Sequence, residues 1–152
     1  LPKSPYKSIC KASEAELTKY GGNNFLYTKV VFMNLMYDLA QEHGARWDVL
    51  AENMQADPRI GTSHMQPVHQ YAHMGGNQGR GAGGHCFIKD FAAFRQLYEK
   101  MHPNDQKGIA LLRAFEGKNN QLLRETGKDL DLLEAVLHTP SGPVTLRSPA
   151  AP

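Results

Sequence analysis

A long stretch with helical hydrophobic spacing, from Ser13 to about His43, constrains the possible folds of this chain more than any other feature. Its apolar residues recur at intervals of three and four but cover more than one stripe of the predicted helix. They include Leu17, Tyr20, Leu26, Val30, Val31, Leu35, Met36 and Leu39. A helix that is apolar on several sides is deeply buried or lies at a subunit interface. At 1.5 Å per residue this helix would be roughly 45 Å long, which suits the spine of an oligomer.

The remaining elements are also predicted to be helices. Ser13 and Glu16 form a capping-box pattern at the start of the first helix, and Gly44 ends it. Further helices are predicted over residues 46–56, 86–101, 106–126 and 130–137. Because no apolar runs alternate like paired strands, the sequence predicts a mainly α fold.

The composition limits the classes of function. With 152 residues, 41% of them hydrophobic and 21% charged, the chain has the size and make-up of one globular domain. The net charge of +2, without blocks of like charge, predicts no nucleic-acid partner, and no apolar run is long enough to predict a membrane span. The two cysteines, Cys10 and Cys86, make no disulfide framework, so we expect a reducing cytoplasm.

Cys86 stands between a glycine-rich loop at 75–84 and a predicted helix. Glycines allow the backbone to approach a ligand closely, and the start of a helix stabilises a thiolate, the nucleophilic form of cysteine. Asp90 follows four residues later, so both side chains would lie on one helix face. This arrangement indicates covalent thiol catalysis beside a carboxylate. Free cysteine is also commonly a buried structural residue, so the pattern alone leaves both interpretations open.

Lys19 and Asn23 form a second candidate pair, four residues apart on the first helix. An ammonium and an amide on one face are suited to stabilise an oxyanion, although such residues are more often solvated surface groups. Gly21 and Gly22 lie between them, and successive glycines in a helix indicate close approach by another backbone or a ligand. Arg59, in a turn after the second helix, either binds a phosphate or carboxylate or is simply solvated.

Two other patterns carry less weight. His64, His69 and His73 lie in the loop after the second helix without a companion ligand motif, so we expect solvent-exposed histidines and no metal site. The glycines at 75–84 do not follow a strand of a βαβ unit, so we expect no nicotinamide binding by that segment.

Three separated motifs, in one order, resemble the central helical domain of the UDP-glucose/GDP-mannose dehydrogenase family. They are AELTKYGGNNFLYTKV at 15–30, DPRIG at 57–61 and GGHCFIKD at 83–90, and the resemblance covers about residues 12–100. It implies a long-helix dimerisation domain. It also implies an enzyme that oxidises the C6 alcohol of a nucleotide sugar twice, UDP-glucose to UDP-glucuronate, with two NAD molecules.

The resemblance also implies roles for single residues. Cys86 would be the nucleophile, forming a thiohemiacetal and then a thioester, and Asp90 would order or activate the hydrolytic water. Lys19 and Asn23 would stabilise the oxyanion, and Arg59 would reach the substrate of a neighbouring subunit. The substrate would also contact Gly83, Gly84 and Phe87, and the cofactor would contact Lys89.

By the same resemblance the chain is a piece of a longer polypeptide. Residues 1–11 would be a connection and the last strand of an N-terminal Rossmann domain, 12–105 the central helical dimerisation and catalytic domain, 106–138 a C-terminal helical extension and 139–152 a flexible tail. Most of the NAD site would lie outside the chain, so the chain alone is expected to be inactive. The segment between the second and third motifs is longer than usual in the family, and His85 stands where serine is common.

Two classes of function therefore remain. The first is the catalytic and dimerisation core of a nucleotide-sugar 6-dehydrogenase in cytoplasmic polysaccharide biosynthesis, with GDP-mannose or a UDP-N-acetyl sugar as alternative substrates. The second is a stand-alone helical oligomerisation module without chemistry. They differ at Cys86, because an activated thiol supports the first and a buried inert thiol supports the second.

Overall fold

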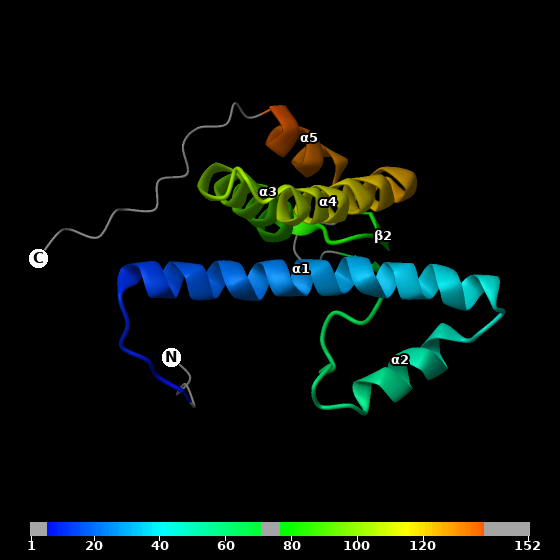
Figure 1. The fold of residues 1–152 in the computed structure, drawn as a ribbon. Helices are drawn as coiled ribbons and strands as arrows, with labels where there is room; N and C mark the ends of the chain where they lie inside the picture. Colours follow the sequence, from blue (N-terminus) through cyan, green and yellow to red (C-terminus); the bar gives the residue numbers. More distant parts are fainter. Residues whose placement is uncertain (1–5, 71–76, 139–152) are drawn as a thin grey trace, which may run out of the picture.

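The computed structural model describes residues 6–70 and 77–138, and most of these residues lie in helices (Figure 1). In chain order the elements are α1 (Ala12–Glu42), α2 (Trp47–Gln55), β1 (Val68–His69), β2 (Gly79–Arg80), α3 (Gly84–Met101), α4 (Gln106–Thr126) and α5 (Leu130–His138). The prediction of a mainly α fold is confirmed. Residues 1–5, 71–76 and 139–152, which include the predicted flexible tail, lie outside the described residues.

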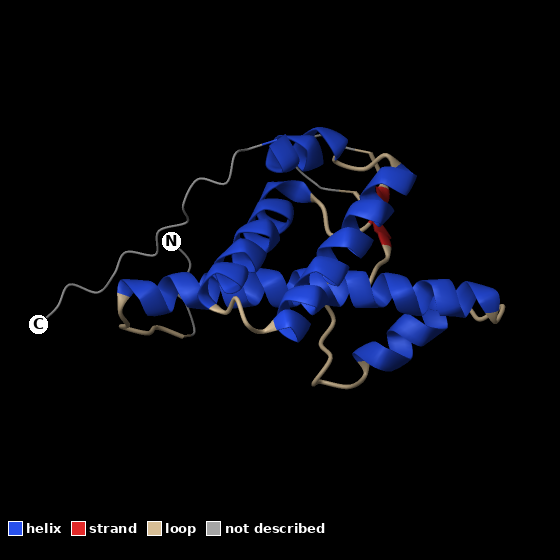
Figure 2. Cartoon of the chain, turned by 45° about the horizontal axis from the view of Figure 1, so that its top comes forward, coloured by secondary structure: helices blue, strands red, loops and turns tan. Residues whose placement is uncertain are grey.

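Helix α1 is the spine of the molecule. Helices α3 and α4 lie on one side of it, α2 lies on the other, and α5 packs against α3 and α4 on the side away from α1 (Figure 1 and Figure 2). The core between α1 and α3 is centred on Tyr27 and Phe91, whose rings stack with centroids 3.9 Å apart, and it includes Val30, Val31 and Ala82. In a second apolar cluster, Trp47 and Ala51 of α2 pack with Met33 and Ala40 in the C-terminal half of α1. This packing sets the N-terminal half of α1 against the helix that carries Cys86.

The ends of α1 follow from local hydrogen bonds. The helix ends just before Gly44, which takes a left-handed conformation with φ of 64°, as the sequence predicts. The predicted cap at Ser13 is wrong, because the helix begins earlier, at Ala12. The carboxylate of Glu14 instead accepts the backbone N–H of Lys11 at 2.8 Å.

The other helices agree with their predicted bounds to within two residues. Helix α4 matches fully, because each end carries a local signal. Asp105 accepts the N–H of Gly108 at 2.9 Å, and Gly127 turns the chain with φ of 67°. The sequence does not predict β1 and β2, which pair antiparallel with Val68 opposite Arg80. A pairing of two residues is too short to show an alternating pattern.

Residues 6–11 form neither helix nor strand. The partners of the strand expected there would belong to a domain outside the chain, so that expectation stays a prediction. Among the described residues, no helix has the apolar length that a membrane crossing needs.

Candidate active site

The centre of the candidate site is Asp90, a buried residue on α3. Asn23, on α1, donates from Nδ2 to the Oδ2 of Asp90 at 2.7 Å. Lys19, one turn earlier on α1, places Nζ 4.0 Å from the same oxygen while 64% of its side chain stays exposed. The packing of α1 on α3 therefore brings together three of the four predicted catalytic residues.

Cys86 is the third residue of α3 and lies one turn before Asp90. Because residues four apart share a helix face, the thiol and the carboxylate lie on the same face of α3. The side chain of Cys86 is exposed. The alternative interpretation, a buried structural thiol, is therefore wrong for this residue.

The glycine-rich loop before Cys86 is held by helix α4. Asn119, which is fully buried, donates from Nδ2 to the carbonyl of Ala82 at 3.0 Å, and its Oδ1 accepts the N–H of Ala82 at 2.7 Å. Gly81 and Gly84 have φ of 92° and 81°, a conformation that favours glycine. The sequence does not predict this role of Asn119, because an asparagine inside a helix has no local pattern that points to a distant loop.

Replacing Asn119 with alanine should lower the free energy of unfolding by about 2–3 kcal/mol, because a buried N–H and a buried C=O of Ala82 lose their partners. Gln121→Ala, which removes an exposed amide from the same helix, should change it by less than about 0.5 kcal/mol. Urea unfolding followed by circular dichroism measures both variants. Equal unfolding midpoints would show that the loop does not depend on Asn119.

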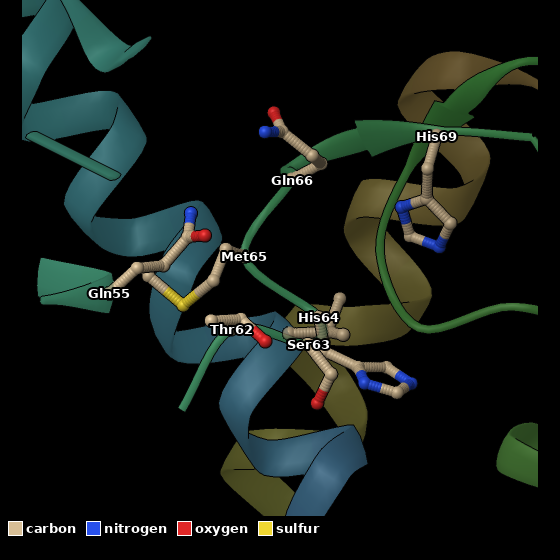
Figure 3. Close-up of a pocket in the computed structure, with 8 residues that line it drawn as sticks. Gln55, Thr62, Ser63, His64, Met65, Gln66 and His69 are labelled. Atoms are coloured by element: carbon tan, nitrogen blue, oxygen red, sulfur yellow. The ribbon is translucent and has the colours of Figure 1, made fainter. Parts of the chain in front are cut away.

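Phe87 connects the thiol region to a pocket in the loop after α2. It is half-buried, and its ring centroid lies 5.6 Å from that of His64. His64 borders a pocket of about 350 Å³ (Figure 3). The pocket is lined by Val30, Gln55, Thr62, Ser63, His64, Met65, Gln66 and His69. Lys29 shapes this loop, since its Nζ donates to three backbone carbonyls within residues 60–63 at 2.6 to 3.3 Å.

Two residues with predicted contacts are not part of the Asp90 cluster in the described portion of the chain. Arg59 is 88% exposed, and its guanidinium pairs with Asp57 at 2.6 Å. Together with Phe25 and Phe32 of α1 it lines a groove of about 320 Å³. Lys89 is exposed on α3. The substrate and cofactor contacts expected of these two residues stay predictions.

The comparison with known families covers most of this structure. Residues 13–121 match the model of the UDP-glucose/GDP-mannose dehydrogenase family, central domain. The chain belongs to this family. The match runs from the first turn of α1 into α4, so it contains Lys19, Asn23, Cys86 and Asp90.

Individual members of the UDP-glucose/GDP-mannose dehydrogenase family are similar over the same region. The UDP-glucose 6-dehydrogenase of Pseudomonas aeruginosa is 38% identical over 116 residues, which are 74% of this chain and 22% of that protein. The UDP-glucose 6-dehydrogenase of Rickettsia felis is 38% identical over 117 residues, 77% of this chain and 24% of that protein. The UDP-glucose 6-dehydrogenase of Bacillus subtilis is 32% identical over 123 residues, which are 80% of this chain and 24% of that protein. The chain thus spans about a quarter of the length of these relatives.

In this member of the family the loop histidines differ from one another. His64 is exposed, as predicted, and His73 lies outside the described residues. The prediction that His69 is exposed is wrong, because it is half-buried with Nε2 2.9 Å from the Nζ of Lys128. A charged ammonium can only donate, so Nε2 accepts and the neutral ring carries its proton on Nδ1. Burial, followed by the charge of Lys128, lowers the pKa of His69 to about 4, and burial lowers the pKa of Lys128 to about 8.

Acid should weaken the fold through His69. Its pKa is about 4 in the folded protein and about 6.5 in the unfolded chain, so the folded state binds fewer protons between these values. The free energy of unfolding should therefore fall as the pH drops from about 6.5 to 4. The full shift corresponds to about 3 kcal/mol, and partial exposure of the ring reduces this to about 1–2 kcal/mol.

Urea unfolding at pH 7 and pH 4.5 measures this effect. His69→Gln should lose most of the difference between the two pH values. His43→Gln, at an exposed position, should keep it. The same pH dependence in both variants would contradict the assignment to His69.

Proposed function

We propose that this chain forms the thiol-bearing core of a nucleotide-sugar 6-dehydrogenase that converts UDP-glucose to UDP-glucuronate in two NAD-dependent oxidations. The observation that carries the proposal is the convergence of Lys19 and Asn23 on Asp90, one helical turn from the exposed Cys86. A cation, an amide, a carboxylate and a thiol at one helix contact are the groups that acyl-thioester chemistry requires. The names of the relatives support the choice of UDP-glucose.

The described residues do not build a dinucleotide site by themselves. A dinucleotide fingerprint needs a strand that leads into a glycine turn and a helix, but β2 has only two residues. The N–H of Gly84, at the start of α3, already donates to Oδ2 of Asp129 at 2.8 Å. We therefore assign NAD binding mainly to another part of the full-length protein, where NAD would supply the acceptor for both hydrides.

Covalent chemistry at C6 falls to residues of this chain. The Cys86 sulfur adds to the aldehyde carbon, and the carbonyl oxygen becomes the oxyanion of a thiohemiacetal. Asn23 has two amide N–H groups and gives one to Asp90, so the other is available for this oxygen. Most of the Lys19 side chain is exposed, and its ammonium adds a positive charge beside the same oxyanion. Together they stabilise negative charge where it develops.

Asp90 serves the last step. After the second oxidation the sugar is bound to Cys86 as a thioester, and water must attack its carbonyl carbon. The carboxylate lies one turn from the sulfur on the same helix face, where it can orient that water and accept its proton. The products are the free acid and the regenerated thiol.

A hybrid enzyme tests this function. In it, residues 6–138 of this chain, which contain the matched region 13–121, replace the corresponding segment of the Pseudomonas aeruginosa relative, so that the NAD-binding parts are supplied. NADH formation is followed with UDP-glucose and, in parallel, with GDP-mannose. We expect activity with UDP-glucose at two NADH per sugar. A folded hybrid that binds NAD but oxidises neither sugar would favour the alternative, a helical oligomerisation module without catalysis.

We also propose that the chain forms a homodimer through an exposed stripe on α1. The stripe consists of Phe25, Phe32, Leu35 and Leu39, spaced at intervals of seven, three and four residues. Such spacing is the seam of a helix pair. Phe25 is 65% exposed and Phe32 is 48% exposed, although both are large and apolar. Arg59 lies beside the stripe, which supports its predicted reach toward the substrate of a partner subunit.

Replacing Phe32 with glutamate should convert the dimer to a monomer, because it puts a charge into the middle of an apolar seam. Sedimentation velocity at micromolar concentration distinguishes the two states. Leu130→Glu, at an exposed leucine that begins α5 on the far side of the molecule from α1, should stay dimeric. If the unsubstituted chain sedimented as a monomer while its circular-dichroism spectrum was fully helical, the proposed dimer would be wrong.

A further inference from the structure

The turn between α4 and α5 reaches across to the loop that carries Cys86. Lys128, in this turn, is 0% exposed. Its Nζ donates to the carbonyl of Gly81 at 2.9 Å and contacts His69 of β1. A buried ammonium is costly unless its protons are used, so these contacts tie the turn firmly to the glycine loop and to β1.

Asp129, the next residue, holds the start of α3. Its backbone carbonyl accepts the N–H of Leu133, so Asp129 begins its own helix α5. Its side chain nevertheless turns to another helix, and Oδ2 accepts the N–H of Gly84 at 2.8 Å. Asp129 also has φ of 51°, in the left-handed region, which aspartate adopts more readily than most residues other than glycine. With its backbone in this turn conformation, the carboxylate of Asp129 reaches the first turn of α3.

The fit around this carboxylate leaves no spare room. A Cβ built on Gly83 would overlap Oδ2 of Asp129 and would lie 2.8 Å from Cε of Lys128. Gly83 and Gly84 are therefore packed against this turn. Both Lys128 and Asp129 lie beyond residue 121, where the match to the family domain ends.

We propose that Lys128 and Asp129 are positioning residues for Cys86. Lys128 fixes the end of the glycine loop, and Asp129 fixes the first turn of α3, so that the thiol at the third position of the helix keeps its place and the support of the helix N-terminus. The proposal rests on the assignment of Cys86 as the nucleophile. Its test uses the thiol itself, so a failed dehydrogenase assay does not decide it.

The experiment measures the rate of alkylation of Cys86 by iodoacetamide in the intact chain at pH 7. Peptide mass spectrometry gives the ratio of the rate at Cys86 to the rate at Cys10, an exposed thiol outside the helices. Asp129→Ala removes both the charge and the acceptor for the N–H of Gly84. Asp129→Asn removes the charge but keeps an oxygen that can accept this N–H.

We expect Asp129→Ala to lower the ratio by about threefold, because a frayed first turn no longer holds the thiol at the helix N-terminus, an effect of the size that helix-terminus charges show. In Asp129→Asn the thiol of Cys86 should react at least as fast as in the unsubstituted chain, because the helix start is kept and a negative charge is removed. Asp131→Asn, an exposed carboxylate two residues on, should leave the ratio unchanged. Faster reaction of both Asp129 variants would overturn the proposal in favour of simple charge repulsion, and an unchanged ratio in both would overturn it as well.

A second measurement covers Lys128. Lys128→Met keeps the length of the side chain and removes its donors, so the amides of residues 81–84 should exchange with deuterium at least about tenfold faster while those in the middle of α1 keep their protection. Uniform loss of protection over the whole chain would show a general structural role and would overturn the positioning role of Lys128.

Discussion

Replacing Cys86 with serine in the hybrid enzyme should stop the formation of the sugar acid. The rate of NADH production should fall by at least about 10³-fold, the order of magnitude expected when a covalent nucleophile is removed. A serine hydroxyl is far less acidic than a thiol and needs a base to become a nucleophile. Asp90, one turn away, is assigned to the hydrolytic water and not to the side chain at position 86.

Cys10→Ser is the matched control, because it makes the same chemical change at the other exposed thiol. It should leave the rate of NADH production unchanged. If the Cys86→Ser hybrid still formed the acid at the parental rate, the assignment of Cys86 as nucleophile would be wrong, whatever the origin of the residual activity.

Replacing Lys19 with alanine should slow the same reaction by about 10²-fold in kcat. The loss of one donor to an oxyanion typically costs about 10²–10³-fold, and Lys19 belongs at the lower limit because 64% of its side chain meets solvent. The covalent route stays intact in this variant, so a stoichiometric thioester on Cys86 should still form and be detectable by mass spectrometry of the quenched enzyme.

Lys11→Ala provides the control for Lys19→Ala. Lys11 is an exposed lysine on the N-terminal side of α1, and only its backbone is used at the helix start. The Lys11→Ala hybrid should keep the kcat of the unsubstituted hybrid. A Lys19→Ala enzyme with an unchanged kcat would remove Lys19 from the oxyanion site and leave Asn23 as the donor from α1.

Local chemistry in the sequence is enough to place the helices and the two pairs of candidate residues. Gly44, Asp105 and Gly127 mark helix ends because a cap depends on neighbours within four residues. The spacing of Lys19 and Asn23, and of Cys86 and Asp90, places each pair on one helix face for the same reason. The start of α1 is an exception, because the capping contact forms two residues earlier than predicted, from the N–H of Lys11 to the carboxylate of Glu14.

Tertiary structure alone decided that these two pairs belong to one site. Asn23 of the first pair and Asp90 of the second are 67 residues apart in the chain, and no local pattern predicts which faces of the two helices pack together. The stacking of Tyr27 on Phe91 sets the register of α1 against α3, and only this register brings the amide to the carboxylate. The structure also shows that the thiol of Cys86 is exposed, whereas composition and spacing did not decide between an exposed and a buried thiol.

The sequence by itself determined a mainly α chain, its family, and the residues that can carry thiol chemistry, because these depend on short-range patterns. Only the tertiary structure revealed the groups that hold the loop in place: Asn119, Lys128 and Asp129. Each is a polar residue whose partner lies 37 to 47 positions away along the chain. A hydrogen bond between distant segments leaves no periodic trace, because its geometry exists only after the helices have packed.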